Sequence, residues 1–172
     1  MSTKELTNEK QTISVSEIAI TGVCIALTFI ATGFINIRLP IAANGGLVHL
    51  GNVPLFLAAI IFGKRTGALA GSIGMALFDL MGGWVLWAPF TFVVVGLMGY
   101  SVGAITEKHH GFRWNVLAIV VACVLKIVGY YIAEGIMFGF TASFFTSVSG
   151  SIVQSGGSAI MFVIIGTALD KI

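Results

Sequence analysis

The chain has 172 residues, of which 57% are hydrophobic and 9% are charged, and its formal net charge is +2. Soluble domains carry about 25% charged residues, so a single soluble core would not hide this much apolar surface. The mean hydropathy of +1.02 therefore indicates a protein for which lipid is part of the solvent. The basic residues are dispersed, which argues against nucleic-acid binding. Cys24 and Cys123 fall in apolar runs, and we interpret them as inert thiols.

The apolar runs predict an all-α polytopic membrane protein with six transmembrane helices. We expect a disordered cytoplasmic N-terminus over residues 1–13, followed by a single six-helix membrane domain over residues 14–172. The first helix is interpreted as uncleaved, because its apolar run exceeds the core of about 7–15 residues that a secretory signal has. The expected helices cover Val15–Phe34, Leu50–Phe62, Thr66–Met81, Pro89–Thr106, Trp114–Phe138 and Ser149–Leu169.

Two helices carry further expectations. Ser14 or Ser16 is the expected N-cap of the first helix, with Glu17 in its first turn. The second helix is too short to cross about 30 Å of hydrocarbon, so it either tilts little or is shielded by protein.

The basic residues predict the orientation. With six passes, seven of the nine Lys and Arg residues fall on one side, and this places both termini in the cytoplasm. Arg38 lies on the other side and Lys126 lies inside a helix. We therefore expect a multi-pass membrane protein. The seven residues are Lys4, Lys10, Lys64, Arg65, Lys108, Arg113 and Lys171.

Two opposite charges are predicted at one depth in the membrane. Asp79 follows Arg65, and Lys126 follows Arg113, by nearly the same number of residues. At 1.5 Å per residue, both lie about 20 Å from the basic side, past the midplane. A charge near mid-membrane costs roughly 2.5–3.5 kcal/mol, so both side chains must face inward. They either form a structural ion pair or contact a polar ligand.

The remaining polar groups gather in the same outer half. Tyr130 and Glu134 continue the stripe that starts at Lys126, although Glu134 also suits a solvated interface. His49 and Asn52 lie at the outer end of the second helix, and Gln154 and Ser155 in the first outer turns of the sixth. Such polar groups beside aromatic faces predict a pocket loaded from outside. The candidate substrate-binding residues are His49, Asn52, Asp79, Trp84, Trp87, Lys126, Tyr130, Glu134 and Gln154.

Two of these features have simpler interpretations. Trp84 and Trp87 also suit an aromatic belt at the membrane interface. The loop Asn36–Gly46 is either a movable cover for the pocket or a plain connector.

Catalytic, metal-binding and cofactor-binding motifs are missing from the sequence. Arg65 follows Gly63-Lys64, where a nucleotide-binding loop needs Ser or Thr. His49 has no second His or Cys at ligand spacing, and no Gly-x-Ser-x-Gly motif occurs. We expect a protein that is not an enzyme, binds no metal or cofactor, and draws energy for any uphill transport from an ion gradient or a partner.

Three segments resemble the S components of energy-coupling factor (ECF) vitamin transporters. These are Asn36–Pro40, Gly46–Pro54 and Gly82–Phe90, and the similarity is greatest to the branch assigned to hydroxymethylpyrimidine or pyridoxine uptake. The resemblance implies high-affinity binding of a vitamin or precursor, with pantothenate or riboflavin as other substrates. It also implies a transmembrane coupling subunit and two cytoplasmic ATPases as partners. The expected partner-contact residues are Ala19, Gly22 and Ala26 on the first helix.

Two other functions remain open at this point. One is a self-sufficient ion-coupled carrier that uses Asp79, Lys126 and Glu134 as a relay. The other is a structural membrane-assembly protein in which these charges are packing pairs.

Overall fold

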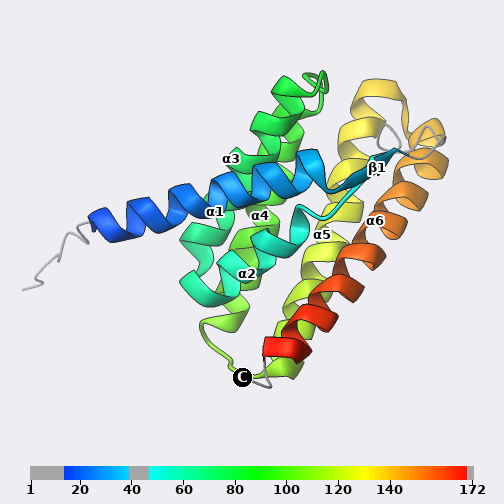
Figure 1. Ribbon diagram of the computed structural model, residues 1–172. Helices are drawn as coiled ribbons and strands as arrows, with labels where there is room; N and C mark the ends of the chain where they lie inside the picture. Colours follow the sequence, from blue (N-terminus) through cyan, green and yellow to red (C-terminus); the bar gives the residue numbers. More distant parts are fainter. Residues whose placement is uncertain (1–13, 39–46, 170–172) are drawn as a thin grey trace, which may run out of the picture.

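The computed structural model describes residues 14–38 and 47–169 as six helices and a short β-hairpin (Figure 1). The all-α polytopic prediction is confirmed, and α1, α4 and α5 are long and apolar enough to cross a membrane. The expected disorder of residues 1–13, and most of the expected covering loop, lie outside the described residues. The elements are α1 (Val15–Phe34), β1 (Asn36–Arg38), β2 (Leu47–His49), α2 (Asn52–Phe62), α3 (Lys64–Met81), α4 (Ala88–Thr106), α5 (Phe112–Phe138) and α6 (Phe140–Leu169).

Helix α6 begins nine residues earlier than predicted, at Phe140 instead of Ser149. Only Gly139, with φ of +93°, separates it from α5. The expected position of Gln154 and Ser155 in the first turns of α6 is therefore wrong. Gln154 lies fourteen residues after Phe140, or about 21 Å along the helix axis.

Helix α5 shows how the bundle faces lipid. Every fourth residue from Val120 to Ile136 is exposed and apolar, whereas Lys126, Tyr130 and Glu134 on another face are buried. This is the reverse of a soluble amphipathic helix, and it is the pattern that a lipid solvent favours. Glu134 is only 3% exposed, so it is not solvated at the interface.

The short helix α2 is shielded by protein, as one of the two predictions for it required. Phe56 and Leu55 are fully buried, and Phe56 meets Phe162 of α6 edge-to-face with ring centroids 6.1 Å apart. The same apolar cluster includes Met98 and Val102 of α4. Because α2 is surrounded by other helices, it needs no membrane-spanning length.

Helices α3 and α4 touch through their backbones. A Cβ atom on Gly99 would overlap the carbonyl group of Gly67, and one on Gly103 would overlap the backbone of Lys64. Glycine lets two helix axes approach closely in lipid, where dispersion contacts replace the hydrophobic effect. This contact fixes α4 against α3 along the half of α3 nearest Lys64.

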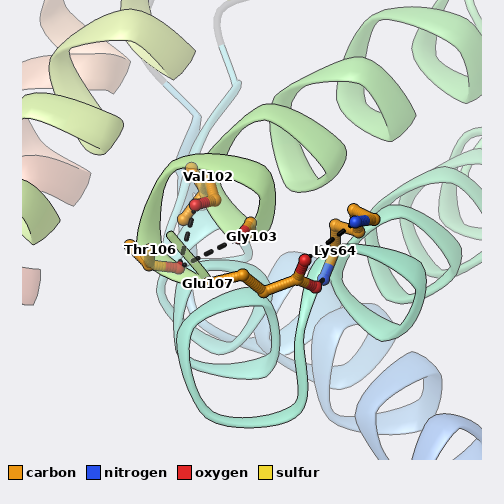
Figure 2. Close-up of polar contacts among 5 residues, drawn as sticks. All are labelled: Lys64, Val102, Gly103, Thr106 and Glu107. Atoms are coloured by element: carbon orange, nitrogen blue, oxygen red, sulfur yellow. Dashed lines mark hydrogen bonds and ion pairs between the residues drawn. The ribbon is translucent and has the colours of Figure 1, made fainter. Parts of the chain in front are cut away.

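One ion pair closes this end of the bundle, which we call the basic end because it holds Lys64, Arg65, Lys108 and Arg113. Glu107 follows α4, and Figure 2 shows its side chain reaching Lys64 at the start of α3. It accepts from the Lys64 backbone N–H and from Lys64 Nζ, both at 2.8 Å. Gly63, with φ of +89°, supplies no cap, so Glu107 caps α3 from another helix.

We expect the contribution of Glu107 to depend on pH. The two hydrogen bonds from Lys64 lower the pKa of Glu107 below its ordinary value of 4.5. The stabilisation is therefore complete above pH 4.5 and is lost as the pH falls through the lowered pKa. The unfolding temperature of Glu107→Gln should lie below that of the parent at pH 7 and should approach the parent value in acid. A difference that does not shrink in acid would contradict this assignment.

Candidate functional site

A cavity lies at the end of the bundle opposite the basic end, which we call the pocket end. Its lining comes from the hairpin, from α4, α5 and α6, and from the end of α3 with the segment that follows it. Its volume is about 40 Å³, which is room for about three water molecules. The lining residues are His49, Asp79, Trp84, Trp87, Thr91, Tyr130 and Gln154.

The turn after α3 places a carboxylate and an indole together. The Trp84 backbone N–H donates to the Asp79 carbonyl at 2.7 Å, and Gly83 between them has φ of +88°. This hydrogen bond and left-handed glycine are those of a Schellman helix end, with Gly83 at the C′ position. Trp84 then meets Trp87 edge-to-face, with ring centroids 5.5 Å apart. One local backbone motif therefore positions three lining residues.

A directed chain of hydrogen bonds links α5, α4 and α3. The Tyr130 and Thr91 hydroxyls lie 2.9 Å apart, and the Asp79 carboxylate lies near enough to the Thr91 hydroxyl to accept a hydrogen bond from it. An ionised carboxylate only accepts hydrogen bonds, so Thr91 donates to Asp79 and Tyr130 donates to Thr91. The Tyr130 and Thr91 hydroxyls thus hold the carboxylate in place.

Three lining residues keep polar atoms without partners. Asp79 Oδ2, Trp87 Nε1 and Gln154 Nε2 are buried, and none has a hydrogen-bond partner among the described residues. A buried polar atom costs about 1–3 kcal/mol when it is left unpaired. The cavity thus offers one acceptor and two N–H donors to a ligand that supplies the opposite groups.

Six of the nine predicted site residues line this cavity: His49, Asp79, Trp84, Trp87, Tyr130 and Gln154. The other three lie outside its lining. Asn52 is 1% exposed and donates to Ser158 Oγ at 3.3 Å, while Lys126 and Glu134 are 2% and 3% exposed. Lys126 Nζ lies 5.9 Å from the Tyr130 ring centroid, beside the cavity wall. A binding role for all nine remains a prediction.

Of the two alternatives for Asp79 and Lys126, the structural ion pair does not form. Among the described residues no ion pair joins these two side chains, whereas Lys64 and Glu107 form one. Equal depth brings the two groups near enough for their charges to interact, but Asp79 bonds to Thr91 instead. The carboxylate is therefore available to a ligand.

Sequence reasoning missed Thr91. It follows Trp87 by one helical turn, so the two share a face of α4. Its spacing of one helical turn from Trp87, a predicted site residue, could have indicated Thr91 as a further site residue.

Replacing Thr91 with valine is expected to lower the free energy of unfolding by about 1–2 kcal/mol, because Asp79 and Tyr130 each lose a partner. Tyr130→Phe should cost a similar amount. The double variant should cost less than the sum, since the three groups act as one network. Thr106→Val is the control, because Thr106 bonds only to carbonyls of its own helix. Additive losses in thermal or denaturant unfolding would contradict the network.

Comparison with known proteins identifies the family. A family model described as "ECF-type riboflavin transporter, S component" matches residues 12–171. The chain belongs to this family of S components. Family membership makes it a membrane transporter component, not a member of an enzyme family, and associates it with ECF membrane and ATPase subunits.

Three relatives of this S component differ in how much of the chain they match and in how similar they are to it. An uncharacterized protein of Pyrococcus woesei is 30% identical over 141 residues, covering 78% of this chain and 95% of that protein. The thiamine precursor transporter HmpT of Lactococcus lactis is 27% identical over 159 residues, covering 92% and 86%. A UPF0397 protein of Streptococcus pneumoniae is 34% identical over 91 residues, covering 52% and 47%.

Proposed function

We propose that this S component is the substrate-binding subunit of an ATP-driven ECF importer in a bacterial plasma membrane. Its substrate is a single-ring vitamin or precursor, hydroxymethylpyrimidine or pyridoxine, taken up from outside. Both termini then lie in the cytoplasm, with the basic end inward and the pocket end outward. The similarity to a thiamine precursor transporter supports the choice of substrate.

The unpaired Asp79 carboxylate oxygen carries the proposal. Asp79 lines a cavity with aromatic walls, and the unpaired N–H groups of Trp87 and Gln154 belong to the same lining. An aminopyrimidine or hydroxypyridine ring supplies a donor for the carboxylate, acceptors for the N–H groups, and a face for stacking.

Binding to the purified full chain tests the proposal. Calorimetry with hydroxymethylpyrimidine, pyridoxine, pantothenate and riboflavin should show saturable binding of a single-ring compound, unchanged by ATP. Mass spectrometry of co-purifying small molecules should find the same compound. Binding of riboflavin alone would overturn the substrate, and no binding across the panel would overturn the function. Transport by the chain alone in liposomes, abolished by a protonophore, would instead indicate an ion-coupled carrier.

The partner surface proposed for α1 is open in this structure. Ala19, Gly22 and Ala26 are exposed, and a Cβ on Gly22 would meet no described atom within 4 Å. An apolar groove beside them includes Val23 of α1 and Phe62 of α2. These small side chains let another helix approach α1 closely, as the coupling subunit would require.

Gly22→Leu is expected to abolish co-purification with the ECF subunits while leaving substrate binding unchanged. The leucine side chain starts from a Cβ position that meets no described atom within 4 Å. Gly156→Leu is the matched control, because Gly156 of α6 is equally open among the described residues. Equal loss of co-purification in both variants, or in neither, would place the contact elsewhere.

A further inference from the structure

His49 is held by the backbone between the hairpin and α2. It is the last residue of β2 and pairs with Asn36 of β1, and the following Leu50 N–H donates to the Ile35 carbonyl at 3.1 Å. The hairpin therefore sets the position of the imidazole, which lines the cavity.

A backbone donor occupies one nitrogen of this imidazole. The Gly51 N–H donates to His49 Nδ1 at 3.2 Å. A neutral imidazole carries one proton, and a nitrogen that accepts a hydrogen bond does not hold it. His49 is thus the Nε2–H tautomer, with an N–H donor on its other nitrogen. If Nδ1 were protonated as well, its N–H group would face the Gly51 N–H group, and the two donors would repel each other.

The surroundings keep this arrangement. Burial, and then the positive charge of Lys126, lower the pKa of His49, so the neutral form persists. Gly51 is closely surrounded, because a Cβ there would overlap Thr32 Oγ1 and lie 3.0 Å from His49 Nδ1. The glycine N–H therefore stays directed at the imidazole.

We propose that His49 is a specificity residue, locked as an Nε2–H donor by Gly51, that selects substrates with an unprotonated acceptor. This inference rests on the proposed function and extends it. His49 Nε2–H joins the N–H groups of Trp87 and Gln154, and Asp79 supplies the opposing acceptor. The cavity therefore prefers a ring with a donor on the edge facing Asp79 and a lone pair, on a ring nitrogen or an oxygen, facing His49.

Long-range proton–nitrogen NMR on the full chain in detergent, labelled at histidine, tests the tautomer directly. The sequence has three histidines, and loss of a signal in His49→Gln assigns the relevant ring. We expect the Nε2–H pattern both without ligand and with hydroxymethylpyrimidine. An Nδ1–H pattern, or rapid exchange between tautomers, would overturn the lock.

Binding of hydroxymethylpyrimidine tests the role. His49→Gln places an amide nitrogen near the position of Nε2 and should change Kd by less than about threefold. His49→Asn keeps an amide only at the Nδ1 position and should raise Kd by about tenfold or more. His109→Gln is the control, because His109 stacks on Trp114 at the basic end, with ring centroids 4.0 Å apart.

Equal affinity of the Gln and Asn variants would overturn the role of His49 as a donor, provided that their unfolding temperatures match. If the parent chain fails to bind hydroxymethylpyrimidine but binds pyridoxine, the same variants are compared with pyridoxine. If the parent binds neither, the proposed single-ring substrate is wrong and the role of His49 in selecting it fails. The NMR pattern then decides the tautomer separately.

Discussion

Asp79→Asn is expected to raise the Kd for hydroxymethylpyrimidine by about 10- to 100-fold. A hydrogen bond to a charged group contributes about 1.5–3 kcal/mol, and each 1.4 kcal/mol corresponds to a factor of ten. Asparagine keeps the shape of the side chain but removes the charge. It also replaces one of two acceptor oxygens with a donor, which opposes the ligand donor expected at Oδ2.

The control for this prediction removes a carboxylate from the other end of the bundle. Glu107→Gln makes the same chemical change beside Lys64, far from the cavity lining, and should leave Kd unchanged. Calorimetric titration of both variants, with unfolding temperatures recorded, makes the comparison. Unchanged affinity in a folded Asp79→Asn protein would remove Asp79 from the site.

Gly99→Ala is expected to cause a large loss of stability for a single added methyl group. The new Cβ would overlap the carbonyl group of Gly67, which is backbone and cannot rotate away. Helices α3 and α4 must then separate, and overpacking of this kind costs typically about 1–3 kcal/mol, and occasionally more. Because Asp79 lies on α3 and its partner Thr91 on α4, substrate binding should weaken as well.

Gly22→Ala is the matched control, since it adds the same methyl group in open space. Thermal unfolding of both variants in one detergent, together with the yield of monodisperse protein, measures the difference. Equal unfolding temperatures for the two variants would show that the contact between α3 and α4 is not as close as described.

The helices could be predicted because their apolar runs are long and their ends carry charges or glycine. The start of α6 could not, because residues 140–148 are rich in Ser, Thr and Phe, which favour a helix only weakly. Here Ser143 is 1% exposed and donates to the Gly139 carbonyl, while Phe144 and Phe145 are exposed to lipid. Without water, the backbone must satisfy its own hydrogen bonds, and the helix extends.

The site could be predicted in part because charged and aromatic residues are rare in such a chain. Counting residues gave the depth of Asp79 and Lys126, but depth does not specify the direction in which a side chain leaves its helix. The residue type of Thr91 did not by itself indicate a role in the site. Thr28, Thr32 and Thr106 all donate to carbonyls of their own helices, whereas Thr91 bonds to α5.

The Schellman turn after α3 has a consequence for how substrate preference changes. The segment 79–91 alone contributes the carboxylate, both indoles and the Thr91 hydroxyl. Its backbone geometry depends on one left-handed glycine, Gly83. An insertion or deletion in this segment would shift the carboxylate, indoles and hydroxyl relative to one another. Exchange of the whole segment between family members would instead transfer these groups as one unit.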